Sequence, residues 1–239
     1  MKDLAECRLY AFVDTAYLRR RSAQVVARQL CEGGADLIQL RAKNSTLEQI
    51  LELAELLLPI TRPAGVGLVV NDHPALAQKL GAELCHLGQE DFFGAGYTQV
   101  SQLSTLPPSP GYGAVYPLSP GVKALPRRDQ VKAGNPQLKI GLSTHGPEQA
   151  HRALAAGADY LAVGPVYATA TKPAAQPVGL EYVRWAAANA RIPWFAIGGI
   201  SLGNLDEVLA AGARRICVVS SILNAEDIAG TCRKFKERL

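Results

Sequence analysis

The sequence has few of the residues that build disulfide scaffolds, metal clusters or membrane spans. Its 239 residues include five cysteines, Cys7, Cys31, Cys85, Cys217 and Cys232, and no two of them form a C-x-x-C pair. An odd number of scattered cysteines, most of them in apolar runs, argues against a disulfide framework and for free thiols in a reducing compartment. No apolar run approaches the roughly 20 residues of a transmembrane helix. No signal peptide is expected either, because no apolar stretch follows the early acidic residues. We therefore expect a cytoplasmic protein.

Charged and aromatic residues are too few and too scattered to mark a nucleic-acid-binding face. Aromatic residues make up 6% of the chain, charged residues 19%, and the formal net charge is +4. Basic residues form only short runs, and no stripe of alternating basic and aromatic residues is present, so we expect no nucleic-acid partner. The hydrophobic share of 48% is ordinary for a globular protein. A mildly basic surface suits small anionic substrates.

Short apolar runs alternate with longer helical patterns along the chain. The runs are near-continuous, as in parallel strands that are buried on both faces. Helical patterns cover residues 22–31, 47–58 and 147–156. Eight such strands in 239 residues predict an α/β fold, a single (β/α)8 TIM barrel spanning residues 1–239, with a doubly wound open sheet as the alternative. The strand candidates are residues 8–13, 37–40, 68–70, 83–87, 138–142, 160–163, 194–197 and 216–219.

Two further patterns support a barrel with one irregular connection. Glycine-led segments at residues 33–36, 81–83, 157–159 and 212–214 each end a helical pattern directly before a strand. Residues 107–136 are rich in proline and glycine, and loops of this length are usually functional or disordered. We expect an extended insertion in the connection between the fourth and fifth strands, outside the barrel, preceded by at most a short helix at 97–106.

Cationic side chains follow the second strand, where an active site of a parallel barrel would lie. Gln39, Arg41 and Lys43 alternate along the strand end, so their side chains point to the same face. Arginine can bind a phosphate through two hydrogen bonds, and lysine adds a point charge. The pattern predicts a phosphate or diphosphate clamp, with a solvated strand end as the alternative.

Carboxylates follow the third and fourth strands. Asn71 and Asp72 end the third strand, and Asp91 follows the fourth. Oxygen ligands from separate loops suit Mg²⁺, which usually takes one or two carboxylates and completes its shell with water and substrate phosphates. The alternative for Asp72 is a cap on a helix that begins near Pro74. His86 lacks partners at zinc-ligand spacing, so we expect it to be packed or hydrogen-bonded.

The later strand ends carry hydroxyls, a lysine and glycines. Ser143 precedes His145 without a third orienting carboxylate, which predicts a hydrogen-bonding serine and not a hydrolase nucleophile. Glycines and small residues after the seventh and eighth strands allow backbone N–H groups to approach a phosphate. The sequence thus predicts two anion sites, a charged one suited to a diphosphate with Mg²⁺ and a neutral one suited to a monophosphate. The groups after strands six to eight are Thr169, Ala170, Thr171, Lys172, Gly199, Val219 and Ser220.

These motifs, in this order, resemble the thiamine phosphate synthase family. The combination is specific, although its pieces are not, and it covers most of the chain from Leu9 to Ala225. The insertion departs from the family's usual connection. The motifs are Gln39-Leu40-Arg41-x-Lys43, Asn71-Asp72, His86-Leu87-Gly88-Gln89-x-Asp91, Gly141-x-Ser143-x-His145, Gly157-Ala158-Asp159-Tyr160, Gly164-Pro165-Val166, Thr169-x-Thr171-Lys172, Ile197-Gly198-Gly199-Ile200 and Val219-Ser220.

The resemblance implies a transferase that joins hydroxymethylpyrimidine diphosphate to thiazole phosphate, giving thiamine phosphate and diphosphate. It implies Mg²⁺ on Asp72 and Asp91, and catalytic roles for Arg41, Lys43, Ser143 and Lys172. The pyrimidine diphosphate would contact Gln39, Arg41, Lys43, Asn71, Ser143 and Lys172. The thiazole phosphate would contact Thr169, Thr171, Gly199, Val219 and Ser220, while Leu40, Ala42 and Ala170 complete the substrate-binding segments.

The implied mechanism is dissociative, with diphosphate leaving before the thiazole nitrogen attacks the pyrimidine methylene carbon. No protein nucleophile is needed, in keeping with the lack of one in the motifs. A thiazole tautomerase of the same fold and a non-catalytic precursor-binding barrel are the alternatives. The complete set of charged motif residues favours the synthase, and the resemblance also suggests a homodimer.

Overall fold

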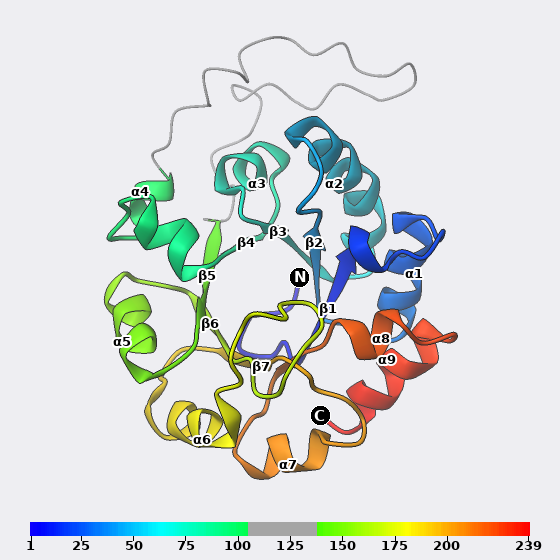
Figure 1. Cartoon of the computed structure of the whole chain (residues 1–239). Helices are drawn as coiled ribbons and strands as arrows, with labels where there is room; N and C mark the ends of the chain where they lie inside the picture. The colour runs from blue at the N-terminus through cyan, green and yellow to red at the C-terminus, as the bar shows by residue number, and fades with distance from the viewer. Residues whose placement is uncertain (105–137) are drawn as a thin grey trace.

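Eight parallel strands close into a barrel in sequence order, β1-β2-β3-β4-β5-β6-β7-β8 (Figure 1). The computed structural model describes residues 1–104 and 138–239. The predicted (β/α)8 barrel is confirmed, and the open-sheet alternative is wrong. The expected insertion at 107–136 lies outside the described residues. The strands are β1 Leu9–Asp14, β2 Leu37–Arg41, β3 Gly67–Asn71, β4 Leu84–Leu87, β5 Lys139–Thr144, β6 Tyr160–Val163, β7 Trp194–Ile197 and β8 Ile216–Cys217.

Helices surround the barrel and cover the outer faces of the strands (Figure 1). Two irregular turns, η1 Thr15–Tyr17 and the π-helical η2 Glu90–Gly94, follow β1 and β4. The η2 turn was not expected from the sequence. None of the described helices is both long and apolar enough to span a membrane. The α-helices are α1 Ala23–Glu32, α2 Leu47–Thr61, α3 Pro74–Leu80, α4 Ser101–Ser104, α5 Pro147–Ala155, α6 Gly179–Asn189, α7 Leu205–Ala210, α8 Ser220–Leu223 and α9 Ile228–Glu237.

Local sequence signals set where the helices begin and end. The Ser22 side chain caps α1 by accepting from the Val25 N–H, and a capping box of Thr46 and Gln49 starts α2. The glycine-led joints behave as expected, because a glycine in each has a left-handed φ that ends one helix and turns the chain into the next strand. These glycines are Gly34, Gly81, Gly157 and Gly212.

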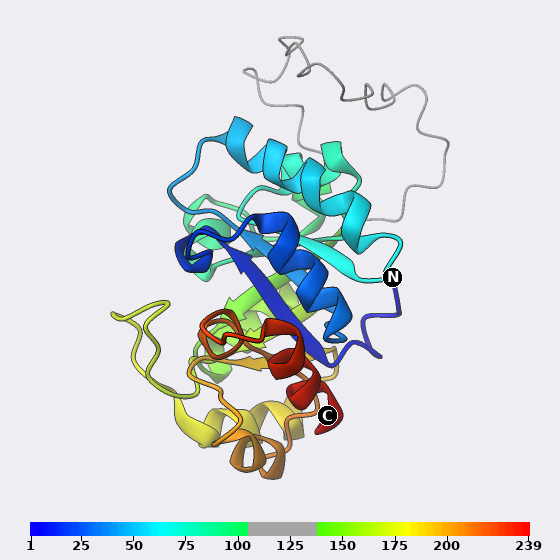
Figure 2. The same cartoon turned by 90° about the vertical axis from the view of Figure 1, so that its right-hand side faces the viewer.

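The strand register brings the polar strand ends together at one end of the barrel. Asp14 of β1 pairs with Arg41 of β2, and Asn71 of β3 pairs with His86 of β4. Leu40, between the polar residues of β2, is buried. Because side chains alternate along a strand, Leu40 and Arg41 face opposite sides of the sheet. The β6–α6 connection projects from this end, and both termini lie at the other (Figure 2).

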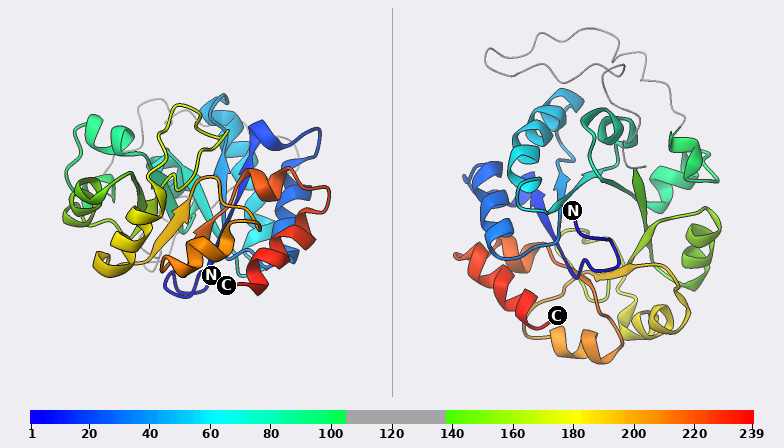
Figure 3. Two further views of the ribbon diagram at one scale, coloured as in Figure 1. Left: turned by 60° about the horizontal axis from the view of Figure 1, so that its bottom comes forward. Right: turned by 180° about the vertical axis from the view of Figure 1, so that it is seen from behind.

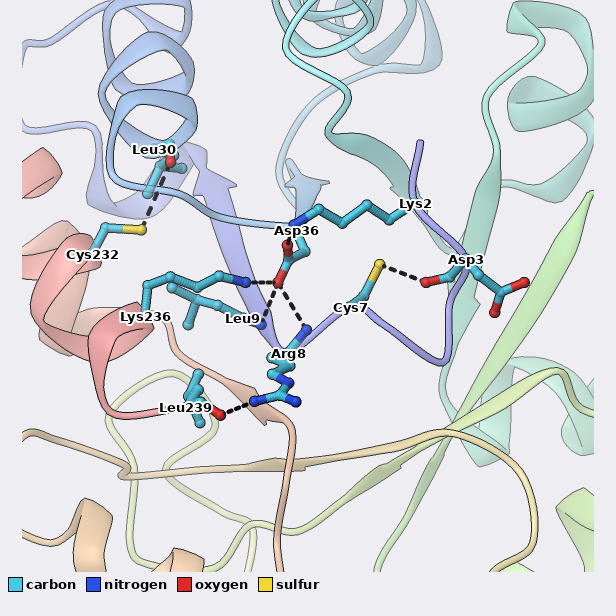
Figure 4. Close-up of polar contacts among 10 residues, drawn as sticks. All are labelled: Lys2, Asp3, Cys7, Arg8, Leu9, Leu30, Asp36, Cys232, Lys236 and Leu239. Atoms are coloured by element: carbon cyan, nitrogen blue, oxygen red, sulfur yellow. Dashed lines mark hydrogen bonds and ion pairs between the residues drawn. The ribbon is translucent and has the colours of Figure 1, made fainter.

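The opposite end of the barrel is closed by the N-terminal segment and held by Asp36. The first residues of the chain cross the opening (Figure 3), where Leu4 is buried. The Asp36 carboxylate accepts from the backbone N–H groups of Arg8 at 2.8 Å and Leu9 at 3.0 Å. It also pairs with Lys2 and with Lys236 of α9 (Figure 4). Asp36 therefore joins the start of β1, the start of β2 and the last helix.

Candidate active site

A pocket opens at the C-terminal ends of the strands, where active sites of such barrels lie. It collects thirteen of the sixteen candidate residues predicted from the sequence. Of the remaining three, Leu40 and Ala42 are buried away from it, and Ala170 is not among the residues that line it in the described part of the chain. The predicted residues that line the pocket are Gln39, Arg41, Lys43, Asn71, Asp72, Asp91, Ser143, Thr169, Thr171, Lys172, Gly199, Val219 and Ser220.

Three cations meet in the pocket, and one of them is held by a buried carboxylate. Arg41 Nη1 lies 2.6 Å from Oδ2 of Asp14, whose side chain is almost fully buried. Burial lowers the pKa of Lys172, and the nearby charges of Lys43 and Arg41 lower it further. All three cations line the same pocket, and their mutual repulsion favours a multiply charged anion over a neutral ligand. Asp14 is not among the residues that we selected from the sequence.

Asp72 and Asp91 also share this space. Burial raises the pKa of Asp72, and the charge of Asp91 raises it further, while Lys43 opposes the shift. The Asp72 backbone has a left-handed φ of 63°, and its N–H donates to the His86 carbonyl at 2.9 Å. His73 occupies the N-cap of α3 without a side-chain hydrogen bond, so the helix-cap alternative for Asp72 is wrong.

The position of Asp91 depends on its local backbone. Asp91 lies in η2, and π-helical turns are frequent at functional sites. A Cβ atom on Gly88 would lie 2.6 Å from Asp91 Oδ2, so the glycine leaves room for the carboxylate. Within residues 1–104 and 138–239, no group of three or more His, Cys, Asp or Glu could hold a metal ion. A pair of carboxylates fits Mg²⁺ completed by water and substrate oxygens better than it fits an all-protein cage.

Ser143 meets a histidine, but the pair lacks the features of a nucleophile. Its Oγ lies 3.0 Å from Nε2 of His86, while a His145 ring nitrogen instead contacts the Gly164 carbonyl. Nδ1 of His86 has no hydrogen-bond partner among the described residues. Burial, with help from Lys172, lowers the pKa of His86 to about 3, so its ring is neutral and a weak base. His86 is packed and hydrogen-bonded, as expected.

Strand β1 supplies residues that the sequence reasoning missed. Tyr10 and Phe12 line the pocket, and with Asp14 they alternate along β1 on one face. The Tyr10 hydroxyl donates to Oε1 of Gln39 at 2.5 Å, and Nε2 of Gln39 donates to Oδ1 of Asn71 at 2.5 Å. Alternation along the first strand places these three residues on one face, as it does Gln39 and Arg41, but it does not show which residues they contact.

The β6–α6 and β7–α7 loops pack tightly against each other at the pocket mouth. Gly199 has a φ of 64°, and a Cβ there would lie 2.6 Å from the Ala168 carbonyl oxygen. The sequence suggested that Gly199 is small to let a phosphate approach, but the neighbouring loop already requires glycine. The Thr171 hydroxyl lies 3.1 Å from the Tyr17 hydroxyl, which ties this loop to η1.

Comparisons with known proteins show the family to which the chain is similar. The family model described as thiamine monophosphate synthase matches residues 9–99 and 121–222. The chain is 45% identical over 208 residues to a thiamine-phosphate synthase of Thermus thermophilus, covering 87% of this chain and 84% of that protein. It is 36% identical to one of Halalkalibacterium halodurans, covering 97% and 95%. A thiamine phosphate pyrophosphorylase from Pyrococcus furiosus superposes with a TM-score of 0.76 at 28% identity, covering 98% and 96%.

Proposed function

The chain belongs to the thiamine monophosphate synthase family, and from that premise we propose that it condenses hydroxymethylpyrimidine diphosphate with thiazole phosphate to give thiamine phosphate and diphosphate. The enzyme is a transferase. One observation carries the proposal beyond the family match: three cations and two carboxylates face a single pocket that also has an uncharged side. That arrangement suits a metal-bound diphosphate beside a second phosphorylated molecule.

The pyrimidine diphosphate is assigned to the charged side of the pocket. Arg41, oriented by Asp14, would bind the diphosphate through two parallel hydrogen bonds, and Lys43 and Lys172 would add point charges. Gln39, on the same face of β2 as Arg41, would contact the pyrimidine ring. Substrate binding would relieve the repulsion among the three cations, which is a source of affinity for a multiply charged anion.

Asp72 and Asp91 are the proposed Mg²⁺ ligands. The two carboxylates repel each other in a partly buried site, and a divalent cation between them would remove that repulsion. When bound there, Mg²⁺ would neutralise part of the diphosphate charge. The cation would make the diphosphate a better leaving group together with Arg41 and Lys172.

The thiazole phosphate is assigned to the opposite side of the pocket. Thr169 and Thr171 offer hydroxyls from the β6–α6 connection, and Ser220 offers a hydroxyl at the start of α8. Gly199 and Val219 contribute main-chain atoms to the same side of the pocket. These groups are neutral, in keeping with a ligand that carries one phosphate.

The side chains can support a dissociative substitution without a covalent enzyme intermediate. The bond between the pyrimidine methylene carbon and the diphosphate oxygen breaks, and its electron pair leaves with the diphosphate. Arg41, Lys43 and Lys172 stabilise the charge that develops on the leaving group. The thiazole nitrogen then donates its lone pair to the methylene carbon. The neutral, weakly basic His86 would hold the Ser143 hydroxyl in place and remove no proton.

The proposal is tested by turnover with both substrates. We expect thiamine phosphate and diphosphate in equal amounts, loss of turnover with EDTA, and recovery with excess Mg²⁺. Lys172→Ala should reduce kcat/KM at least tenfold. Lys139→Ala is the matched control, since Lys139 starts β5 at the other end of the barrel. Isomerisation of a thiazole phosphate without condensation would favour the tautomerase, and binding without any turnover would favour the non-catalytic barrel.

A further inference from the structure

A directional chain of hydrogen bonds runs from the first strand to the carboxylate of Asp72. Tyr10 donates to Oε1 of Gln39, and Nε2 of Gln39 donates to Oδ1 of Asn71, both at 2.5 Å. Nδ2 of Asn71 then donates to Oδ2 of Asp72. The chain crosses three neighbouring strands, β1, β2 and β3, and ends in the pocket.

The carboxylate sets the direction of every bond in this chain. An ionised carboxylate only accepts, so Asn71 must turn its amide nitrogen toward Asp72. The Asn71 oxygen then faces Gln39, which must present its own nitrogen. The Gln39 oxygen consequently faces Tyr10, which must donate. Reversing either amide would place two oxygens against each other, so the Tyr10 proton is required to complete the chain.

Tyr10 is well fixed to play this part. Its ring is buried, stacks on Phe12 with centroids 5.5 Å apart, and meets Phe195 edge-on at 5.4 Å. Burial raises the pKa of Tyr10 well above its ordinary value, and nearby Tyr160 raises it further. The phenol therefore keeps its proton and remains a donor at the end of the chain.

We propose, resting on the proposed function, that Tyr10 is a positioning residue for this reaction. Its hydroxyl fixes which end of the Gln39 amide faces the pyrimidine substrate. Through Asn71 it also fixes the direction in which Asp72 faces its cation. Without the hydroxyl, Oε1 of Gln39 becomes a buried acceptor without a donor, and the amide can find a new donor only by giving up its bond to Asn71.

Tyr10→Phe removes only the hydroxyl and is the primary test. One lost hydrogen bond predicts a KM for the pyrimidine diphosphate that rises roughly tenfold, and a half-saturating Mg²⁺ concentration that rises by a similar factor. The KM for the thiazole phosphate should stay unchanged. Calorimetric titration with the pyrimidine diphosphate and Mg²⁺, without the thiazole phosphate, should show the same loss of affinity independently of turnover.

Tyr160→Phe is the matched control. Tyr160 is also fully buried, and its hydroxyl lies 3.4 Å from that of Tyr10. It is not among the described residues that line the pocket. We expect both KM values and the Mg²⁺ dependence of this variant to stay within about twofold of wild type, since the bond between Tyr10 and Gln39 is kept.

A double-mutant cycle with Gln39→Leu tests whether Tyr10 acts through Gln39. Leucine removes both the acceptor of Tyr10 and the donor to Oδ1 of Asn71, so Gln39→Leu and the Tyr10→Phe/Gln39→Leu protein lack the same bond to Asn71 and differ only in the Tyr10 hydroxyl. The double variant should match Gln39→Leu within about twofold in affinity for the pyrimidine diphosphate. A larger further loss would overturn the proposal, because Tyr10 would then act by another route.

Other outcomes separate this inference from the proposed function. Wild-type protein that binds the pyrimidine diphosphate but makes no thiamine phosphate would refute the proposed function alone, and the inference would then be decided by the binding titrations. Normal turnover with a Tyr10→Phe protein that binds like wild type would refute the inference alone. Equal weakening for both substrates would also refute it, since that would indicate a general structural defect.

Discussion

Replacing Asp36 by alanine would remove the group that holds the N-terminal segment and α9 against the barrel. Its side chain is only 2% exposed. The carboxylate accepts from the N–H groups of Arg8 and Leu9 and pairs with Lys2 and Lys236. Alanine keeps the backbone but supplies no acceptor. The substitution therefore leaves two backbone donors at the start of β1 without their partner.

The backbone donors set the size of the effect. Leu9 is fully buried, and an unsatisfied buried N–H costs about 1–3 kcal/mol. Arg8 is exposed, so its N–H can reach water at a smaller cost of roughly 1 kcal/mol. The Lys2 side chain is 57% exposed, and such ion pairs contribute at most about 1 kcal/mol. We expect Asp36→Ala to lower the free energy of unfolding by about 2–5 kcal/mol, and Lys2→Ala by less than about 1 kcal/mol.

The loss of stability in Asp36→Ala should become smaller at low pH. Burial alone would raise the pKa of Asp36, but hydrogen bonds from Lys236, the Leu9 N–H, Lys2 and the Arg8 N–H lower it below the ordinary value of 3.8. A carboxylate whose pKa is lowered on folding stabilises the protein at pH values above the pKa that it has in the unfolded chain. That stabilisation is lost as the pH falls through the folded pKa. The difference between wild type and Asp36→Ala should thus shrink below about pH 4.

Equilibrium unfolding in urea, followed by circular dichroism at pH 7 and again near pH 3, measures both effects. Asp206→Ala is the control, since its carboxylate also pairs with a cation, Arg238, but is 85% exposed. That variant should stay within about 0.5 kcal/mol of wild type. The reasoning fails if Asp36→Ala is no less stable than Asp206→Ala, or if its deficit is the same at both pH values.

Three further predictions concern the pocket. Asp72→Ala and Asp91→Ala should each reduce turnover at least a hundredfold without changing the melting temperature by more than a few degrees. If the turnover of either variant depended on the Mg²⁺ concentration as that of the wild type does, the metal assignment would be excluded. Asp14→Ala should lower kcat/KM for the pyrimidine diphosphate about tenfold, because Arg41 loses its orienting partner; unchanged kinetics would mean that Arg41 orients itself. Lys172→Ala should mainly lower kcat/KM for the pyrimidine diphosphate, whereas Ser220→Ala should raise the KM for the thiazole phosphate several-fold. Steady-state kinetics with each substrate varied in turn measures both, and equal effects of both variants on both substrates would reject the two-sided pocket.

The barrel could be predicted because its signals are local and repeated. Each strand is a short apolar run, and each glycine-led joint needs a left-handed residue at a fixed place, as at Gly157. Strand ends differed by one or two residues, for example in β8, which ends at Cys217 and not at residue 219. The gathering of Arg41, Asp72 and Lys172 in one pocket followed from parallel topology alone.

The partners of these residues could not be predicted, because they depend on the register between strands. In the sequence, nothing distinguishes Asp14 from other acidic residues, because its alignment with Arg41 is known only from the structure. The sequence likewise predicts only that Tyr10 is a buried aromatic residue, because its hydrogen bond to Gln39 is known only from the structure. Leu40 and Ala42 were included because they lie between functional residues, yet alternation along β2 turns Leu40 away from the pocket.

The β6–α6 connection, residues 164–178, has a consequence for how the two substrates affect each other. It carries Lys172, assigned to the diphosphate, together with Thr169 and Thr171, assigned to the thiazole phosphate. With these assignments, the substrate that binds first would restrain a segment that the second must also contact, so less conformational entropy would remain to be lost. Thermodynamic linkage would make this coupling reciprocal, so we expect each substrate to raise the affinity for the other by the same factor. Cooperation between two unlike ligands would then arise from one short connection, with no need for a change in the barrel beneath it.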